Sequence, residues 1–389
     1  MHSDSIVFSI FLIFTGAAVL ATVALYARQA MLVAYLVLGA LLGPAGFGWI
    51  TDADLISDIA HVGIIFLLFL LGLNLYPQKV VEVFRETLFV TLLSSVLFAI
   101  LGYSIAWFSG LSPRDCLLVG IAVTFSSTII GLKLLPTTAL HHRHTGELVI
   151  GVLLIQDFLA ISALLVLHGL EKDNMPVTDI GLLVLSLPAL VLFAYLTERY
   201  FINLLFKKFD RIQEYIFLLA LGWCLGMAQL AQSLGLSYEI GAFIAGVAVA
   251  TNPIARFIAE SLRPLRDFFL VMFFFALGAG FDFASARAMW FPALLLAGCV
   301  LFCKPMVFRF LLVRSAETNK LAWEIGFRLG QLSEFSLLIV FIALEAQLMS
   351  TMAANLIQMA TMITFIGSSY LVIFRYPTPI AVSDKLRRD

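Results

Sequence analysis

The sequence has 389 residues, of which 61% are hydrophobic and only 13% are charged, and its mean hydropathy is +1.02. A soluble globular protein carries about 25% charged residues, so this composition excludes a soluble domain and indicates a membrane protein. The formal net charge is −1 and no basic stripe stands out, which excludes a nucleic-acid partner.

The chain divides into about thirteen apolar segments, judged against the about 20 residues that cross a bilayer core about 30 Å thick. No basic stretch or cleavage site precedes the first segment, which is therefore interpreted as a retained helix. The predicted fold class is an all-α polytopic membrane protein with about 13 transmembrane helices. The segments are 5–26, 31–48, 56–75, 87–109, 115–135, 147–169, 179–203, 214–232, 237–251, 266–281, 288–312, 320–345 and 351–374.

Basic residues are distributed unevenly between the loops. Loops that follow odd-numbered segments, together with the C-terminal tail, carry most of the lysines and arginines. Loops that follow even-numbered segments carry only Arg114, Lys172 and Arg287. Because positive loops stay in the cytoplasm, we expect the N-terminus outside and the C-terminus in the cytoplasm.

Thirteen helices can be divided into two six-helix halves joined by one extra helix. Two such halves have opposite orientations in the membrane, which is the inverted-repeat plan of many secondary transporters. In that plan the substrate site lies near the bilayer midplane, at helices that are interrupted.

Asp157 is the leading candidate for the functional residue. It lies near the middle of the sixth segment, where an ionisable group costs at least ~2.5–3.5 kcal/mol and is a functional hypothesis by default. A carboxylate at this depth can hold a proton or a cation but not both, which is the simplest chemistry for exchange. Its neighbour Gln156 is neutral and offers a carbonyl oxygen. The alternative is a structural Asp that caps a neighbouring helix.

The fifth segment carries a cluster of hydroxyl groups at mid-depth, including Ser126, Ser127 and Thr128. Such hydroxyls can give oxygens to a dehydrated cation or hydrogen bonds to broken backbone. They can also be ordinary packing contacts between membrane helices.

The twelfth segment has a matching interruption at 330–336, which reads GQLSEFS. The fifth and twelfth segments occupy the same place in the two halves, and interruptions at corresponding positions point to a transport site. We expect Glu334 to balance the partial charges of the broken helix ends. Lys304, inside the eleventh segment, is expected to neutralise a carboxylate or those same ends.

Other features indicate no further chemistry. The four-residue spacing of Cys299 and Cys303 fits a redox or metal pair, but buried small side chains are the preferred interpretation. Gly222 and Gly226 are spaced for close helix approach. We expect no cofactor, no resident metal and no enzymatic activity.

Four stretches together resemble one family. Residues 35–44 read YLVLGALLGP, residues 61–73 read HVGIIFLLFLLGL and residues 235–246 read GLSYEIGAFIAG. The twelfth segment adds Glu334 followed by Phe and Ser. In this order and spacing they resemble the monovalent cation:proton antiporter-2 family, and within it the potassium-efflux (Kef-type) antiporters.

The resemblance implies a sodium/proton antiporter-like fold and a homodimer embedded in lipid. Residues 1–376 would form the exchanger domain, and residues 377–389 a short cytoplasmic tail. Helices 1–3 and 8–10 would be the dimer scaffold, and helices 4–6 and 11–13 a mobile core. The fifth and twelfth helices would unwind and cross beside Asp157.

The resemblance also assigns roles to single residues. Asp157 matches the carboxylate that alternates between proton and cation, and Lys304 matches the family's helix lysine. Ser127 and Thr128 match hydroxyls of the crossing region. A glutamine before the aspartate, here Gln156, is similar to the potassium-selective group and suggests electroneutral exchange.

The predicted function is therefore K⁺/H⁺ antiport by an elevator-like movement, in a bacterial inner membrane. The alternatives are Na⁺/H⁺ antiport on the same fold, a cation channel, or a sodium-coupled solute symporter. Two features depart from the family. Asn74 stands where relatives usually have an acidic residue, and Kef-type proteins resemble an antiporter fused to a cytoplasmic nucleotide-binding regulatory domain. The chain either lacks such a domain or is a truncation of a longer protein.

Overall fold

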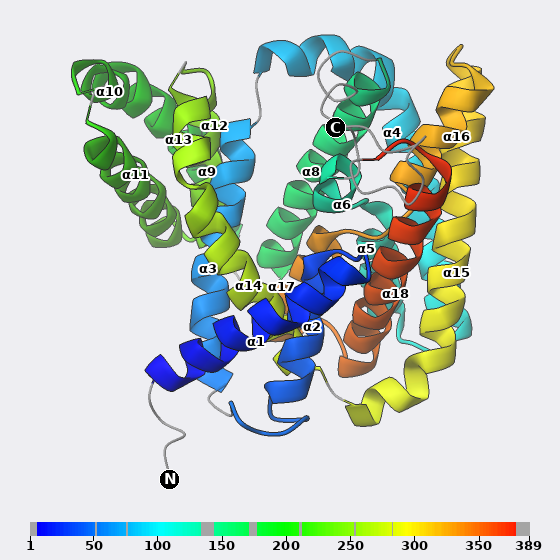
Figure 1. Cartoon of the computed structure of the whole chain (residues 1–389). Coiled ribbons are helices and arrows are strands. Elements are labelled where there is room, and N and C mark those ends of the chain that lie inside the picture. The colour runs from blue at the N-terminus through cyan, green and yellow to red at the C-terminus, as the bar shows by residue number, and fades with distance from the viewer. Residues whose placement is uncertain are drawn as a thin grey trace. The chain divides into compact units, whose positions relative to one another are not determined.

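The computed structural model of the chain describes residues 6–378 apart from 51–52, 75–76, 134–143, 171–176, 210–211, 253 and 282. Within these residues the secondary structure consists of α-helices and one π-helical turn, with no strand (Figure 1). The predicted fold class is confirmed. In chain order the elements are α1 (Ile6–Tyr26), α2 (Met31–Leu42), α3 (Ala53–Asn74), α4 (Pro77–Phe108), α5 (Pro113–Thr124), α6 (Thr128–Lys133), α8 (His144–Leu170), α9 (Val177–Thr197), η1 (Glu198–Ile202), α10 (Asn203–Lys208), α11 (Gln213–Ser233), α12 (Tyr238–Ala250), α13 (Ala255–Ser261), α14 (Arg263–Ala279), α15 (Phe283–Arg314), α16 (Asn319–Arg328), α17 (Glu334–Glu345) and α18 (Thr351–Arg375).

Each predicted segment coincides with one helix or with two consecutive shorter helices of the described chain. The fifth segment is divided into α5 and α6, and the twelfth into α16 and α17. Among the described residues, seven helices are at least 18 residues long and apolar enough to cross a membrane, and shorter apolar helices include α2 and α12. The short helices α10 and α13 were not expected from the sequence.

Two predicted boundaries differ from the structure for reasons that involve proline. The second segment was expected to reach residue 48, but α2 ends at Leu42 and Gly43 is extended, with φ −69° and ψ 178°. The residue before a proline avoids the helical region, and Pro44 follows Gly43. Conversely, α4 begins at Pro77, because proline is well accommodated in the first turn of a helix.

The chain forms two compact units. The first consists of Met1–Thr51, Val81–Leu164 and Leu277–Asp389, and the second of Asp52–Val80 and Leu165–Ala276. Each unit is therefore assembled from stretches that are far apart in the sequence.

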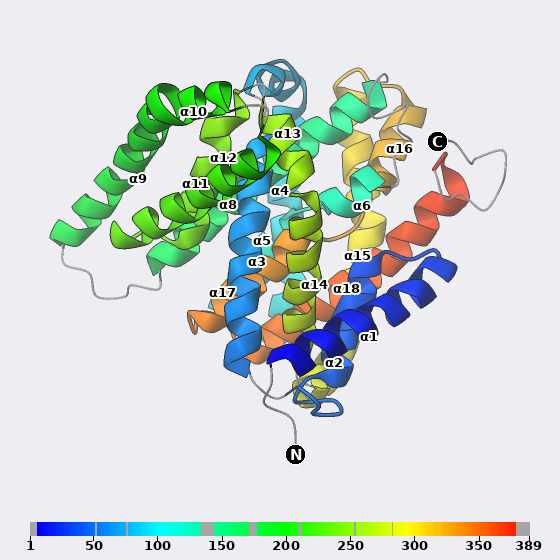
Figure 2. The same ribbon diagram turned by 60° about the vertical axis from the view of Figure 1, so that its left-hand side comes forward.

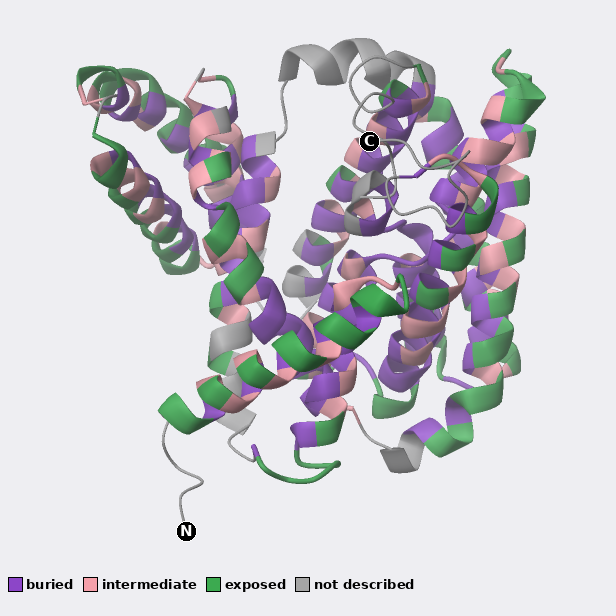
Figure 3. Cartoon of the chain, viewed as in Figure 1, coloured by how far each residue is buried: buried purple, intermediate pink, exposed green. Residues whose placement is uncertain are grey.

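In the first unit, α15 packs along α18 and α16, and α17 packs against α5 and α18 (Figure 1). One side of α15 carries exposed aromatic residues, among them Trp290, Phe291 and Phe302. The same helix also carries buried residues, among them Val300 and Phe308, and both buried and exposed residues occur along it (Figure 3). Large apolar side chains on an exposed helix face are expected where the helix contacts lipid rather than water.

The start of α5 is anchored to the start of α18 within the same unit. Ser112 caps α5 by accepting a hydrogen bond from the Asp115 backbone amide at 3.1 Å. The Asp115 carboxylate in turn accepts one from the backbone amide of Ser350, the N-cap of α18, at 2.9 Å. The same carboxylate accepts a hydrogen bond from the Ser112 hydroxyl at 2.9 Å, so a single buried carboxylate contacts the N-caps of two helices.

In the second unit, α3 and α12 lie in close contact and α11 packs against α12 (Figure 2). Glycines on both helices allow the approach. A Cβ atom at Gly246 would lie 3.0 Å from the Cα of Gly72 and would also collide with the carbonyl oxygen of Phe69. The indole of Trp223 on α11 donates to the Ala245 carbonyl of α12 at 3.0 Å.

Candidate transport site

The two interrupted helices of the first unit meet at their interruptions. The Ser126 hydroxyl, between α5 and α6, donates to the carbonyl of Leu329, between α16 and α17, at 2.9 Å. The Gln331 amide donates in the opposite direction, to the carbonyl of Ser127, at 3.3 Å. Ser126, Ser127 and Gln331 are each at most 1% exposed. The two breaks therefore supply hydrogen-bond partners for each other, as membrane-embedded irregular backbone requires.

Serine side chains explain where the second half of each helix begins. The Ser127 hydroxyl accepts from the backbone amide of Ile130 at 3.1 Å and so caps α6. Ser333 caps α17 in a capping box, in which the Ser336 hydroxyl accepts from the Ser333 amide at 3.2 Å. The Ser336 hydroxyl also donates to the Ala122 carbonyl of α5 at 2.6 Å, which ties the start of α17 to the end of α5.

Lys304 of α15 lies between the carbonyl groups of both breaks. Its ammonium nitrogen donates to the carbonyls of Phe125 at 2.6 Å and Gln331 at 3.1 Å, and it lies 3.4 Å from the Ser126 hydroxyl. The side chain is fully buried, and its nitrogen lies 5.1 Å from the ring centre of Phe98. The charge of Lys304 therefore faces the carbonyl ends of two helices, where the helix dipole is negative.

Asp157 lies on α8 and is 2% exposed. The Thr128 hydroxyl donates to its carboxylate, at 3.3 Å from one oxygen and 3.5 Å from the other. Glu334, in the first turn of α17, lies within electrostatic range of this carboxylate. Among the described residues no lysine or arginine forms an ion pair with Asp157, and Lys304 uses its donors on backbone carbonyls instead.

Gln156 holds the first break closed. Its carbonyl oxygen accepts from the backbone amide of Ser126 at 3.0 Å, and its amide group donates to the carbonyl of Thr124 at 3.2 Å. The side chain thereby replaces helical hydrogen bonds that are lost when α5 ends. Gln156 and Ser126 are each 1% exposed and Thr124 is 7% exposed, so these groups are shielded from water.

Helix α18 contributes two residues that sequence reasoning missed. The Ser368 hydroxyl donates to the side-chain oxygen of Gln331 at 2.8 Å, and the Thr364 hydroxyl accepts from the Leu332 amide at 3.2 Å. Both stabilise the second break. The only signal in the sequence is their four-residue spacing on one helix face, which is common in membrane helices.

The structure brings all the predicted site residues together in one unit. Among the five expected to bind proton or cation, Thr128 contacts Asp157 directly. The side chains of Gln156, Ser126 and Ser127 instead form hydrogen bonds with backbone groups at the two breaks. A direct role of these three residues as cation ligands stays a prediction.

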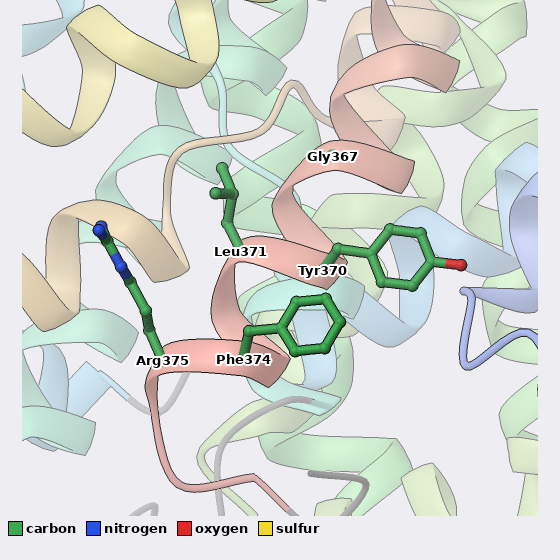
Figure 4. Close-up of a pocket in the computed structure, with 5 residues that line it drawn as sticks. All are labelled: Gly367, Tyr370, Leu371, Phe374 and Arg375. Carbon is green, nitrogen blue, oxygen red and sulfur yellow. The ribbon is translucent and has the colours of Figure 1, made fainter. Parts of the chain in front are cut away.

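Among the described residues, no group of three or more His, Cys, Asp or Glu side chains is arranged to hold a metal ion. A groove of about 420 Å³ runs along the end of α18 and is lined by Gly367, Tyr370, Leu371, Phe374 and Arg375 (Figure 4). Its lining is almost entirely apolar and contains none of the polar groups described above.

The fold and the site define a multi-pass membrane transporter in which two interrupted helices meet beside one buried carboxylate. Residues 10–374 match the family described as sodium/hydrogen exchanger, transmembrane, and the chain belongs to this family.

Several known proteins are similar to the chain. It is 28% identical over 355 residues to the iron transporter MagA of Paramagnetospirillum magneticum, covering 88% of this chain and 79% of that protein. It is 29% identical over 328 residues to K(+) efflux antiporter 4 of Arabidopsis thaliana, covering 81% of this chain and 54% of that protein. The chain thus spans about half the length of this protein and of K(+) efflux antiporters 5 and 6 of the same organism, which it also matches. The structure of the sodium proton antiporter MjNhaP1 from Methanocaldococcus jannaschii shares the fold, with a TM-score of 0.66 and 17% identity over 94% of this chain and 95% of that one.

Proposed function

We propose that the chain is a secondary antiporter that exchanges one K⁺ for one H⁺, with Asp157 binding either ion in turn. The observation that carries this proposal is the setting of Asp157, which is 2% exposed and has the Thr128 hydroxyl as its hydrogen-bond donor. An ionised carboxylate that is buried without a counter-ion is strongly unfavourable. A bound proton or a bound monovalent cation each removes the unfavourable charge, so each stabilises the same buried site.

The arrangement favours electroneutral exchange. Gln156 carries no charge, and both ends of its amide are used on the backbone of the first break. Lys304 is likewise engaged by carbonyl groups of the two breaks. Asp157 then gains and loses a single positive charge in each half of the cycle, either as H⁺ or as K⁺.

The choice of K⁺ rests on the glutamine before the aspartate and on relatives that are named K(+) efflux antiporters. Na⁺/H⁺ exchange by the same mechanism is the second candidate, supported by the family's description and by the name of MjNhaP1. The name of the bacterial relative, an iron transporter, adds iron as a third ion to be tested, with Fe²⁺ as the probe.

The cycle that we propose is elevator-like. The predicted segments 87–109, 115–135, 147–169, 288–312, 320–345 and 351–374 would carry Asp157 across the membrane. The dimer scaffold would consist of the predicted segments 5–26, 31–48, 56–75, 214–232, 237–251 and 266–281. The N-terminus would face the outside and the C-terminus the cytoplasm of a bacterial cell, as the basic loops favour.

The test is proton flux in proteoliposomes that contain a pH dye, after separate additions of K⁺, Na⁺ and Fe²⁺. We expect a response to K⁺ that does not change when the membrane potential is clamped. Asp157→Asn should abolish this response while the protein remains folded, because the amide cannot exchange a proton for a cation. Asp267→Asn, which changes an exposed carboxylate paired with Arg266, is the matched control and should transport normally.

Each outcome bears on a different part of the proposal. Retained K⁺ transport in Asp157→Asn would remove the proposed mechanism. A response to Na⁺ alone that Asp157→Asn abolishes would keep the role of Asp157 and replace the ion. A response to Fe²⁺ alone would reject the one-for-one exchange, because a divalent ion cannot replace a single proton without moving net charge.

A further inference from the structure

Helix α16 ends at Arg328, immediately before the second break. The next carbonyl, that of Leu329, accepts the hydrogen bond from Ser126, and the carbonyl of Gln331 accepts one from Lys304. The orientation of the last turn of α16 therefore determines where both carbonyls point.

The side chain of Arg328 fixes this last turn from two directions. It is 1% exposed, and its guanidinium donates to the Glu324 carboxylate of the same helix at 2.8 Å and 3.1 Å. One of its nitrogens also donates to the carbonyl of Pro377, beyond the end of α18, at 2.9 Å. The planar guanidinium thus joins α16 to the chain segment that follows α18.

Ring contacts strengthen the same junction. The ring centres of Phe327 and Tyr376 are 5.9 Å apart, and the guanidinium carbon of Arg328 is also 5.9 Å from the Tyr376 ring. Arg375, which projects from the last turn of α18 in Figure 4, lies 5.1 Å from the Phe327 ring. Residues 375–377 therefore contact both of the last two residues of α16.

We infer that Arg328 is a positioning residue for ion exchange, which holds the carbonyls of Leu329 and Gln331 in place through the segment after α18. This inference rests on the proposed function for its effect on transport. Lysine cannot replace arginine here, because a single ammonium group lacks the fork that reaches the carboxylate and the carbonyl together. The position of residues 375–377 is consequently coupled to the second break.

The test compares Arg328→Lys with Arg309→Lys in the proteoliposome assay. Arg309 contacts the beginning of α16, through Asn319 at 2.7 Å and the Trp323 ring at 5.0 Å, but not its end at the break. Both variants keep the charge. We expect Arg328→Lys to raise the KM for K⁺ about tenfold with a nearly unchanged maximal rate. Loss of a residue that orients a metal ligand has an effect of this size in metal sites. Arg309→Lys should leave the KM unchanged.

A purely structural role of Arg328 would lower the amount of folded protein and its thermal stability, but would leave the KM of the folded fraction unaltered. Tyr376→Ala gives a second variant if Arg328→Lys does not fold. It removes the ring that contacts Phe327 and Arg328, and we expect it to raise the KM in the same direction.

Hydrogen–deuterium exchange separates this inference from the proposed function. The amides of Leu332 and Ser333 are held by the hydroxyls of Thr364 and Ser336, so their exchange reports on the second break whichever ion is carried. We expect faster exchange at these amides in Arg328→Lys and Tyr376→Ala, and the same rate as in the unmodified chain in Arg309→Lys. If the unmodified chain shows no K⁺ flux and the two variants still show faster exchange, the positioning role is supported and K⁺ transport is rejected. Unchanged exchange together with an unchanged KM in both variants would overturn the inference.

Discussion

At the scale of single residues, Lys304 shows that a buried charged side chain can donate to backbone carbonyls rather than pair with another charge. The sequence left open whether it neutralises a carboxylate or helix ends. Its ammonium group contacts the carbonyls of Phe125 and Gln331 and is fully buried. Hydrogen bonds from a charged donor to carbonyls are stronger than neutral ones, so Lys304 is expected to stabilise the crossing of the two breaks.

We therefore predict that Lys304→Met destabilises the protein by about 1–3 kcal/mol, because two carbonyls remain buried without their charged donor. Methionine has a similar length and is apolar, so little packing is lost. The measurement is thermal unfolding of the purified protein in detergent or lipid. Lys304→Gln, which retains two donors, is the matched control and should lose less stability.

A double variant tests the alternative that Lys304 acts as the counter-charge of Asp157. If the two residues act independently, the effects of Lys304→Met and Asp157→Asn on stability should add within about 0.3–0.5 kcal/mol. Recovery of the Lys304→Met stability by Asp157→Asn would instead show direct charge coupling.

Residues could be predicted when their chemistry contrasts with their surroundings. Asp157 and Lys304 are ionisable groups in apolar stretches, and the structure places both beside the breaks. Thr364 and Ser368 are neutral hydroxyl residues like many others in membrane helices, so nothing in the sequence marks their contacts with the second break. The hydrogen bond from the Ser126 backbone amide to the Gln156 side chain joins residues that are 30 apart in the sequence, so no local pattern could predict it.

At the scale of elements, the helices and their interruptions could be predicted from hydropathy, because apolar length and polar insertions are local properties. The pairing of helices could not. Gly222 and Gly226 have the spacing for close approach, yet no heavy atom of another part of the described chain lies within 4 Å of a Cβ at either position. Close approach occurs at Gly72 and Gly246, where α3 meets α12.

Gly246→Ala should consequently destabilise the second unit by about 1–3 kcal/mol, as overpacking does elsewhere. The added methyl group would meet the backbone of α3 at Phe69, Gly72 and Leu73, and backbone cannot move aside as a side chain can. The measurement is the shift of the thermal unfolding midpoint relative to the unmodified chain.

Gly226→Ala is the matched control for this prediction. It places the same methyl group on exposed α11, where nothing lies within 4 Å, and alanine favours helix by about 0.8–1.0 kcal/mol. The control should therefore be neutral or slightly stabilising. Equal destabilisation by both substitutions would contradict the prediction, because it would show that the α3–α12 approach does not determine the effect.

At the scale of the whole molecule, the proposed orientation in the membrane rests on charge rather than on packing. Loops after even-numbered segments carry only Arg114, Lys172 and Arg287, so the other side of the membrane receives nearly all the positive charge. The two interrupted helices occupy equivalent places in two halves of opposite orientation, as an inverted repeat requires. Internal geometry alone does not distinguish the two sides, whereas the loops do.

We therefore predict that a fluorescent protein fused after Asp389 fluoresces, because the proposed orientation puts the C-terminus in the cytoplasm, and that alkaline phosphatase fused there is inactive. Fusion within residues 171–176, which follow an even-numbered segment, should give the reverse result. The in-frame fusion within residues 134–143, after an odd-numbered segment, is the matched control and should behave like the C-terminal fusion. The same reporter activity at 134–143 and at 171–176 would contradict the helix count between them, while a reversal at every position would keep the count and invert the proposed orientation.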